Sequence, residues 1–425
     1  MINDKIKKKI LIISNAKADS GRLAERLYDN FLKYDYDVDY LTLYPIDRRP
    51  DIKHIYSKDN KWIRYTTDIV WKLIYKIRKP LTKFGFFNYS DRQLPVKFSH
   101  IRHATNNKIY DVVITYFWQH FLTPITIKQI YQYYKCKIIF CMTDFGALAG
   151  GCHYYCDCDR YKEGCGKCPA WRSHNKNDIT HKNSLIRKKI YNEIKPIITG
   201  NSYMQDVYLK SFLLNNCTYM KTYGTVNLNL FTKKDRLKLK AKYEIPVQKS
   251  TILFFGCQSL TDEKKGMRIL LDALNDLSNQ IEEKEKENIL LLIAGKDITP
   301  IMPYLPFDYK YLGLVQYDKL PEVYSLSTCF LSPSISDAGP SMVNQSLACG
   351  TPVVAFDIGI AQDCVITEQT GYRAKIGDSI DFAKGIKYIC CLNEEEYKQM
   401  SDNCRSLAEE YFSINSSIER FKKFF

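Results

Sequence analysis

The sequence predicts two Rossmann-like, doubly wound α/β domains that face each other across a cleft. The chain has 425 residues, which is more than one hydrophobic core usually organises. In each half, short apolar runs alternate with amphipathic stretches, and this rhythm is typical of parallel sheets with helices on both faces. A polar, basic stretch at 227–250 separates the halves. We therefore expect an N-terminal domain over 1–228, a C-terminal domain over 229–400 and a final helix over 401–425.

The first half opens with an apolar run at residues 9–14, of the kind that buried parallel strands show. A polar loop containing Gly21 follows, and an amphipathic helix is expected at 23–32. Gly21 is a candidate for close backbone approach to an acceptor or a phosphate, and an ordinary turn glycine is the alternative. Further strands are expected at 111–117, 137–142 and 196–200.

The second half repeats this alternation. A strand at 250–256 precedes a helix that includes residues 267–274. More strands are expected at 288–295, 329–334 and 352–356. The last stretch, 393–425, has a helical pattern throughout.

Composition limits the classes of function. Lys and Arg number 62 against 47 Asp and Glu, so the net charge of +15 favours polyanionic partners such as nucleic acid, anionic membrane or phosphate-bearing substrates. No apolar run is long enough to span a membrane, and the N-terminus lacks the features of a signal peptide, so a cytoplasmic location is expected. Fifteen cysteines are an odd number, and in a cytoplasmic protein they argue against a disulfide framework.

The most informative stretch is 332–356. After an expected strand, a tight loop leads through Asp337 and Gly339 to a helix that begins near Ser341. Gly339 permits close backbone approach, and the free N–H groups of the helix start suit a diphosphate. Asp337 and Gln345 lie on either side of this loop, where polar side chains reach sugar hydroxyls.

A second basic loop follows the strand that ends at Gly256. It carries Lys264 and Lys265, directly before Gly266 and the next helix. A pair of cations at the end of a strand can neutralise the phosphate groups of a bound ligand. A solvated lysine pair on a surface loop is the alternative interpretation.

These two segments resemble the signature of the retaining glycosyltransferases of family 4, which have the two-domain GT-B fold. The resemblance implies that Asp337 contacts the transferred sugar, that Gln345 stands where the family has a Glu that holds the ribose, and that Lys264 and Lys265 touch the diphosphate. It also implies no metal requirement for catalysis, UDP-linked donors rather than GDP-linked ones, and a final helix that packs back on the first domain. The likeness covers most of 195–425 and the segment 110–170.

The loop at 150–169, with the residues just before it, resembles one branch of these enzymes, common in bacterial surface-polysaccharide gene sets. Asp144 occupies the place where the family often presents a His to the donor sugar, and a turn cap is the alternative for it. Four cysteines ending in a C-x-x-C suit a structural zinc ion, with His153 as a substitute ligand, and reduced thiols that brace a loop are the alternative. The four are Cys152, Cys158, Cys165 and Cys168, and Cys156 is additional.

Residues 61–79 have basic side chains on one helical face, apolar side chains on another, and two tryptophans. A helix of this kind lies on an anionic membrane surface and would suit a lipid-linked acceptor. A peripheral helix whose apolar face joins the core explains the pattern equally well.

Three functions compete at this point. The first is a glycosyltransferase that builds a surface polysaccharide, with a nucleotide sugar and a glycan or lipid-linked glycan as its partners. The second is another enzyme on the same scaffold, such as a nucleotide-sugar epimerase. The third is a nucleic-acid-binding protein, which ranks last because the basic residues are spread over both halves and no recognised nucleic-acid module is present.

Overall fold

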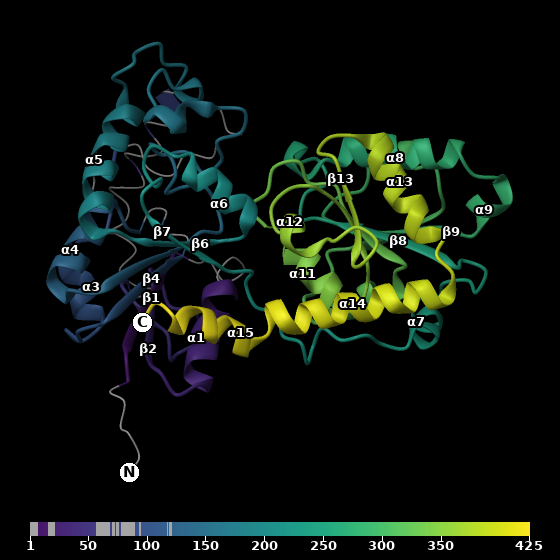
Figure 1. Ribbon diagram of the computed structural model, residues 1–425, viewed down its shortest axis with the longest axis horizontal. Helices are drawn as coiled ribbons and strands as arrows, with labels where there is room; N and C mark the ends of the chain where they lie inside the picture. The colour runs from purple at the N-terminus through teal and green to yellow at the C-terminus, as the bar shows by residue number, and fades with distance from the viewer. Residues whose placement is uncertain are drawn as a thin grey trace. The chain divides into compact units, whose positions relative to one another are not determined.

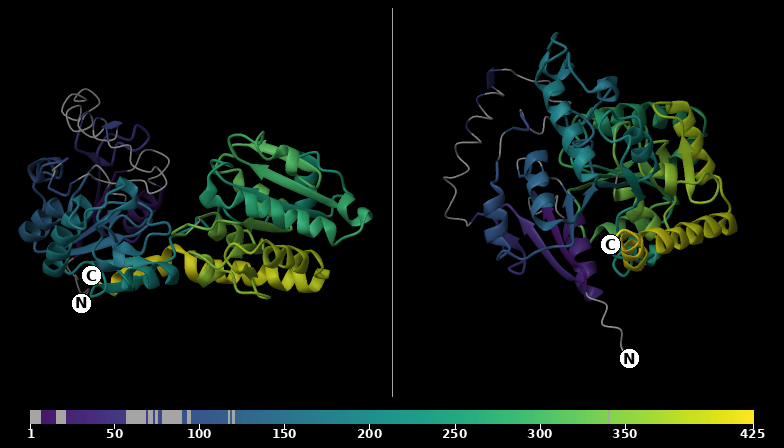
Figure 2. Two further views of the ribbon diagram at one scale, coloured as in Figure 1. Left: turned by 90° about the horizontal axis from the view of Figure 1, so that it is seen from above. Right: turned by 60° about the vertical axis from the view of Figure 1, so that its left-hand side comes forward.

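The computed structural model describes residues 7–15, 22–56, 69, 73, 76–77, 90–92, 95–116, 118, 121–339 and 341–425. The described chain divides into two compact units. Unit 1 comprises Met1–Gly200, Met204–Thr222 and Ile418–Phe425, and unit 2 comprises Asn201–Tyr203 and Tyr223–Ser417. Both units are drawn in Figures 1 and 2.

Unit 1 is built around a seven-stranded sheet in the order β3-β2-β1-β4-β5-β6-β7, and every printed strand pair is parallel. Its strands are β1 (Lys9–Ser14), β2 (Asp37–Thr42), β3 (Lys53–His54), β4 (Val112–Tyr116), β5 (Lys137–Cys141), β6 (Ile197–Gly200) and β7 (Thr218–Lys221). Its helices are α1 (Arg22–Lys33), α3 (Phe98–Ala104), α4 (Pro124–Tyr134), α5 (Ile179–Ile194) and α6 (Ser202–Leu209), with short 3₁₀ helices η2 (Asp159–Glu163) and η3 (Pro169–Trp171).

Buried apolar strands form the centre of this sheet. All five residues of β4 are buried, and so are five of the six residues of β1. Strands covered on both faces need apolar side chains at successive positions rather than at alternate ones. The end of the chain adds to this unit, because the Phe421 and Phe425 rings pack against Phe31 of α1.

Unit 2 has a six-stranded sheet in the order β10-β9-β8-β11-β12-β13, again parallel in every printed pair. Its strands are β8 (Thr251–Gly256), β9 (Ile289–Ala294), β10 (Tyr309–Gly313), β11 (Cys329–Ser332), β12 (Val353–Phe356) and β13 (Gly371–Ala374). Its helices are α7 (Arg236–Lys242), α8 (Met267–Asn279), α9 (Glu283–Glu287), α10 (Leu320–Leu326), α11 (Ser341–Ala348), α12 (Ala361–Cys364), α13 (Ser379–Cys390) and α14 (Glu394–Phe412), with 3₁₀ helices η4 (Glu263–Lys265) and η5 (Met302–Tyr304).

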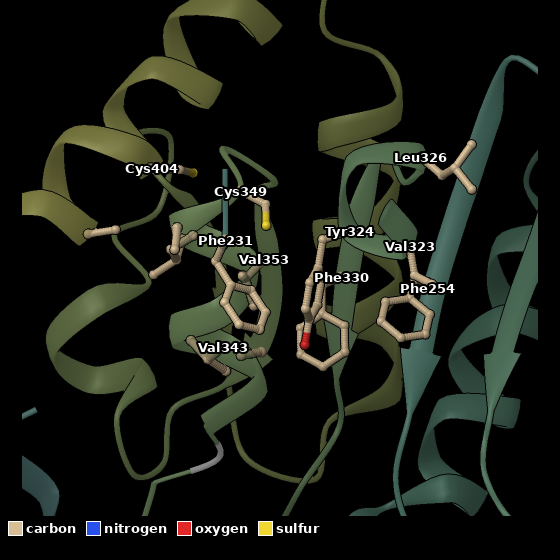
Figure 3. Packing of buried hydrophobic residues seen from close by; sticks show 14 of the residues in the cluster. Phe231, Phe254, Val323, Tyr324, Leu326, Phe330, Val343, Cys349, Val353 and Cys404 are labelled. Atoms are coloured by element: carbon tan, nitrogen blue, oxygen red, sulfur yellow. The ribbon is translucent and has the colours of Figure 1, made fainter. Parts of the chain in front are cut away.

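Successive side chains of the unit 2 strands enter different cores on the two faces of the sheet. In β8, Phe254 joins a cluster with residues of α10, α11 and α14, whereas Leu253 and Phe255 join a second cluster with residues of α8 and α13. Figure 3 shows the first cluster, with Phe254, Tyr324 and Phe330 close to one another. Helices therefore cover both faces, and the prediction of two parallel-sheet α/β domains is confirmed.

Several elements differ from the expectation. The strands β2, β3, β7, β10 and β13 have no counterpart among the expected strands. The final helical stretch is two helices, α14 and α15 (Ile414–Lys422), because Ser413 has an extended backbone and its hydroxyl accepts a hydrogen bond from the N–H of Ser416. No helix among the described residues is long and apolar enough to cross a membrane.

Candidate functional site

Two loops of unit 2 follow the neighbouring strands β8 and β11 and are joined by a backbone hydrogen bond. The first contains η4, whose N-terminus is capped by Asp262 through the N–H of Lys264. The N–H of Ile335, in the second loop, donates to the carbonyl oxygen of Lys264 at 2.9 Å. The carboxyl ends of parallel strands share one edge of the sheet, where ligands of such folds bind. The two segments singled out from the sequence therefore meet at this edge.

Gly266 makes this meeting of the loops sterically feasible. Its φ is +67°, and a Cβ added there would lie 1.8 Å from the carbonyl oxygen of Pro333 at the end of β11. Only glycine adopts this backbone conformation readily, and only glycine leaves room for the second loop. Gly266 thus has a structural reason for its place after the two lysines.

We expect Gly266→Ala to lower the free energy of unfolding by roughly 3 kcal/mol or more, because the backbone strain adds to a clash between backbone atoms. Gly313→Ala is the matched control, since Gly313 also has a positive φ, +63°, but no atom lies within 4 Å of an added Cβ. It should cost only about 1 kcal/mol. Denaturant unfolding of both variants checks this, and equal losses would contradict it.

Lys265 and Asp337 form the central contact between the two loops. The Lys265 Nζ lies 2.5 Å from the Asp337 Oδ2, and the Asp337 Oδ1 accepts a hydrogen bond from the N–H of Gly339 at 3.0 Å. Burial by itself would lower the pKa of Lys265, but the carboxylate of Asp337 outweighs it and raises the pKa. The lysine therefore stays charged. The Lys265 side chain is 33% exposed and the Asp337 side chain is 16% exposed. A bound anion could accept hydrogen bonds from the same ammonium group.

Lys264 differs from its neighbour. Its Nζ lies 4.0 Å from the Asp262 Oδ2, and its backbone carbonyl accepts the hydrogen bond from the N–H of Ile335 in the second loop. Gly256, at the end of β8, packs against β9, since an added Cβ would lie 3.1 Å from the Cβ of Ala294. Strand packing therefore accounts for this glycine.

The loop around Gly339 is held by Asn201, which belongs to unit 2. The Asn201 Nδ2 donates to the carbonyl oxygen of Ala338 at 2.5 Å, and it would lie 3.0 Å from a Cβ at position 339. The backbone of Gly339 is therefore approached closely, in this case by a protein side chain. Ser341 is exposed at the first turn of α11.

Gln345 lies on α11 and is buried, with 6% of its surface exposed. Its Oε1 accepts a hydrogen bond from the hydroxyl of Tyr324 at 3.2 Å. Tyr324 is fully buried in the cluster of Figure 3. The amide oxygen is thus engaged with the core, which leaves the amide NH₂ as the group that could donate to a ligand.

In unit 1, Asp144 follows β5 and pairs with His153. Asp144 is 4% exposed, its Oδ1 accepts from the N–H of Gly146 at 2.6 Å, and its Oδ2 lies 3.6 Å from the His153 Nδ1. Burial raises the pKa of Asp144, and the nearby imidazole and the Gly146 N–H oppose this. The His153 side chain is 20% exposed although its Nδ1 is buried. His153 therefore presents the accessible part of the pair, and Asp144 orients it.

A buried polar network fixes the loop that carries Asp144. Arg187 of α5 donates to both carboxylate oxygens of Asp91, at 2.6 and 3.0 Å, and to the carbonyl oxygens of Gly146 and Ala149, both at 2.6 Å. Asn183 bridges the N–H of Asp91 and the carbonyl of the residue after Ala149. Arg187 and Asp91 could not be identified from the sequence, because they are 96 positions apart and belong to no motif.

From the sequence, His153 was expected only as a substitute zinc ligand. The structure instead brings it to Asp144, nine positions earlier, and its backbone carbonyl accepts from the N–H of Phe145. A His at the start of a loop that returns to the end of a buried strand is the signal that could have identified the pair.

The four predicted cysteines line one pocket of unit 1. Cys156 does not line it. Burial raises the pKa of Cys152 well above its usual range, and the charges of the other three pocket cysteines act in the same direction. Among the described residues, no three His, Cys, Asp or Glu side chains are arranged, as they stand, to hold a metal ion.

Two predicted features fall wholly or mainly outside the described residues. Gly21 lies outside them, as does most of the basic amphipathic segment 61–79. Within that segment the described residues Ile69, Leu73 and Ile77 have helical backbone and are 43%, 54% and 70% exposed.

Comparison with known proteins finds a family match over the part of the chain that contains Lys265 and Asp337. Residues 235–407 match the model of the family described as glycosyl transferases group 1. N-acetyl-alpha-D-glucosaminyl L-malate synthase from Bacillus anthracis is 21% identical over 244 residues, covering 56% of this chain and 61% of that protein. An uncharacterized glycosyltransferase from Haemophilus influenzae is 28% identical over 141 residues, covering 33% of this chain and 36% of that protein. The matched regions thus span less than two thirds of these curated relatives.

Solved structures match over nearly the whole chain. Sucrose-phosphate synthase from Thermosynechococcus elongatus has a TM-score of 0.68 at 16% identity, with 98% of both chains covered. Anabaena HepE in complex with UDP and glucose has a TM-score of 0.62 at 14% identity, covering 98% of this chain and 99% of its own. These likenesses establish the fold, that of GT-B proteins. Residues 235–407, which match the model of the glycosyl transferases group 1 family, include Lys265 and Asp337.

Proposed function

We propose that the chain is a retaining glycosyltransferase that moves a sugar from a nucleoside-diphosphate sugar to a growing surface polysaccharide carried on a lipid. The observation that carries the proposal is the pairing of Lys265 with Asp337, where the loops after β8 and β11 meet. This pair lies within the matched glycosyltransferase group 1 domain. The assignment to surface-polysaccharide synthesis rests on the resemblance of the cysteine loop at 150–169 to one branch of the family 4 glycosyltransferases.

In the proposed reaction, the diphosphate of the donor replaces Asp337 as the partner of the Lys265 ammonium group, with Lys264 nearby. Asp337, freed from this lysine, then accepts hydrogen bonds from the sugar hydroxyls. The acceptor hydroxyl forms a bond to the anomeric carbon on the face from which the nucleoside diphosphate leaves, and the departing phosphate oxygen takes the proton. Lysine charge stabilises the leaving group in a partly water-excluded site, so no catalytic metal is required.

The remaining site residues have supporting parts in this proposal. The free amide NH₂ of Gln345 would donate to a ribose hydroxyl. The backbone at Gly339 and Ser341, at the start of α11, would face the diphosphate. UDP is the preferred nucleotide, in keeping with the complexes of HepE with UDP and with UDP-glucose.

We further propose that the enzyme acts at the cytoplasmic face of the membrane, where it reaches a lipid-linked acceptor. The support is the exposed apolar stripe Ile69, Leu73 and Ile77, one helical turn apart, in a chain with a net charge of +15. Cosedimentation with anionic vesicles but not with neutral ones is the expected result. Equal failure with both kinds of vesicle would remove the membrane contact from the proposal.

A thermal-shift screen against UDP, GDP, ADP and CMP, without added metal, tests the proposed function. At a concentration 100 times Kd, binding adds about 2.7 kcal/mol of stability, which is a shift of roughly 5–10 °C for a domain of this size. We expect one nucleoside diphosphate to stabilise the protein and the shift to vanish in Lys265→Ala. Absence of any shift would contradict the proposal. Donor conversion without acceptor would favour an epimerase instead.

We expect His153→Ala to lower kcat/KM by about tenfold or more, because the accessible imidazole loses its contact with a sugar hydroxyl. Asp144→Asn should have a smaller effect, since the amide keeps an oxygen for the Gly146 N–H and loses only the charge beside the imidazole. Steady-state kinetics on both variants, with His174→Ala as an exposed control, check this. An Asp144→Asn loss larger than that of His153→Ala would reverse the assignment.

A further inference from the structure

Asp337 lies in a loop without regular structure, so its carboxylate needs support from elsewhere in the fold. Between the end of β11 at Ser332 and the start of α11 at Ser341, no described residue belongs to a helix or a strand. The backbone of such a loop keeps one conformation only where hydrogen bonds or packing hold it. The contacts around residues 337–339 therefore decide how the Asp337 side chain is aimed.

The peptide group that joins Ala338 to Gly339 is held at both of its ends. Its carbonyl oxygen accepts a hydrogen bond from the Asn201 Nδ2 at 2.5 Å. Its N–H, which belongs to Gly339, donates to the Asp337 Oδ1 at 3.0 Å. Because a peptide group is planar, its carbonyl and its N–H turn together. The amide of Asn201 therefore sets the direction of the Gly339 N–H, and through it the position of one Asp337 oxygen.

The two oxygens of Asp337 have separate partners. Oδ1 accepts from the Gly339 N–H, whereas Oδ2 faces the Lys265 ammonium group. In the proposed reaction the diphosphate of the donor replaces Asp337 at Lys265, and the bond to the Gly339 N–H then keeps the carboxylate oriented. Oδ2 is thereby left in a fixed place to accept a hydrogen bond from a sugar hydroxyl.

Asn201 itself is held firmly. It is 5% exposed, and the residue after it, Ser202, donates from its N–H and its hydroxyl to the two carboxylate oxygens of Asp363, at 2.7 and 2.5 Å. Asp363 lies on α12, in the same unit as Asn201 and the Asp337 loop. Hydrogen bonds to an ionised carboxylate are stronger than neutral ones, so the backbone beside Asn201 is well fixed. A side chain that orients another group needs a rigid base of this kind.

The turn before α12 also packs against the Asp337 loop. Gly359 in this turn has a φ of +59°, and a Cβ added there would lie 3.1 Å from the carbonyl oxygen of Asp337 and 3.3 Å from the backbone nitrogen of Gly339. Backbone therefore lies against backbone, which leaves the loop little room to shift. Packing confines the loop, and the amide of Asn201 fixes the orientation of its central peptide group.

We propose that Asn201 positions the Asp337 carboxylate for sugar transfer, an inference that rests on the proposed function. Asn201 acts through the Ala338–Gly339 peptide group and not by contact with the substrate, so it is a positioning residue. Without its amide the peptide group can turn, and Asp337 loses its orientation while Lys265 keeps its charge. A displacement of about 1 Å at such a group can cost about 100-fold in rate.

Asn201→Ala and Asn344→Ala form a matched pair of variants. Asn344 of α11 is also buried, with 7% of its surface exposed, and its Nδ2 donates to the carbonyl oxygen of Tyr223 at 2.8 Å within the same unit. Each variant loses one buried hydrogen bond between an amide and a carbonyl. The Tm should therefore fall by a similar amount in both, roughly 2–8 °C.

Hydrogen–deuterium exchange of peptides that cover residues 335–339 measures how firmly the loop is held, without any substrate. Exchange should be about tenfold or more faster in Asn201→Ala than in the parent protein, because the central peptide group has lost its fixed partner. Asn344→Ala should exchange like the parent protein. Unchanged exchange in Asn201→Ala, or equal acceleration in both variants, would overturn the inference.

Release of UDP from UDP-glucose, together with the Kd of UDP from calorimetry, separates positioning from support of the fold. Asn201→Ala should lower kcat by about tenfold or more, whereas Asn344→Ala should stay within about a factor of two of the parent value. The Kd of UDP should change by less than about threefold in Asn201→Ala, since UDP carries no sugar for Asp337 to contact. An unchanged kcat in Asn201→Ala, or an equal fall in both variants, would contradict the positioning role.

A double-mutant cycle tests whether Asn201 acts through Asp337. Added to Asp337→Ala, the substitution Asn201→Ala should lower kcat by no more than about a further factor of two, because the group that it positions is already absent. Losses that multiply would show that Asn201 acts independently of Asp337.

Asn201→Ser covers the case in which the alanine variant does not fold. Its hydroxyl keeps a polar group in the buried space but is too short to reach the Ala338 carbonyl, so the same changes in exchange and kcat are expected. Failure of the proposed function has a different signature. The parent protein would then neither bind UDP nor release it from UDP-glucose, while exchange of the loop would still respond to Asn201→Ala.

Discussion

Alanine in place of Lys265 is expected to lower turnover by roughly 10²- to 10³-fold, while the free energy of unfolding changes by less than about 1 kcal/mol. The two effects separate because the ion pair with Asp337 is partly exposed and worth little to folding. In the proposed transition state, by contrast, the same ammonium group faces the charge that develops on the leaving diphosphate. Steady-state kinetics and denaturant unfolding of one preparation measure both quantities.

Lys286→Ala is the matched control for this prediction. It removes an ion pair of similar length, 2.6 Å to Glu283, from the surface of the same unit. Its turnover should stay within a factor of two of the parent value, since α9 carries no site residue. If Lys265→Ala lost stability and turnover in proportion, the lysine would be a structural residue, and its assignment to the diphosphate would be wrong.

Methionine in place of Arg187 is expected to cost roughly 3–5 kcal/mol of unfolding free energy, the largest effect on stability that we predict. The guanidinium is fully buried, and burial by itself would lower its pKa, but the carboxylate of Asp91 outweighs this and raises the pKa. Removing the arginine leaves a buried carboxylate without its partner, and the carbonyl oxygens of Gly146 and Ala149 without their donor. Thermal and denaturant unfolding measure the loss.

A double-mutant cycle separates the ion pair from simple loss of packing. Arg187→Met combined with Asp91→Asn should lose clearly less than the two single losses added together, because no uncompensated charge remains. Arg373→Met, which breaks an exposed pair with Asp357 at 3.3 Å, should cost less than about 1 kcal/mol. Additive losses at Asp91 and Arg187 would show that their pairing contributes little.

The sequence predicted the central strands of both sheets closely. The expected strand at 9–14 is β1, and the expected strand at 288–295 contains β9 (Ile289–Ala294). These strands are covered on both faces, so nearly every side chain must be apolar, and the run is visible without knowledge of its neighbours. The sequence did not reveal β2 or β10, because half-buried or exposed positions in both strands interrupt the apolar run.

The loops of the candidate site could be located from the sequence, since each combines a strand end with glycine, charge and a helix start. The pairing of residues between these loops could not be predicted from the sequence. Lys265 and Asp337 are 72 positions apart, and only the adjacency of β8 and β11 brings them together. That His153 and not Asp144 is the accessible member of their pair also required the structure, because the burial of Asp144 and its pairing with His153 are properties of the folded loop.

The sequence by itself therefore determined the layered architecture, the places of the glycine-rich and basic loops, and the set of cysteines that line one pocket. The tertiary structure decided which charges pair, which polar groups are buried, and which atoms remain accessible. In Gln345, for example, the side-chain oxygen accepts a hydrogen bond from the hydroxyl of Tyr324. The physical reason is one of range. Hydrophobic periodicity and turn chemistry act between near neighbours in the chain, whereas burial and pairing depend on strand order, which joins residues far apart in sequence.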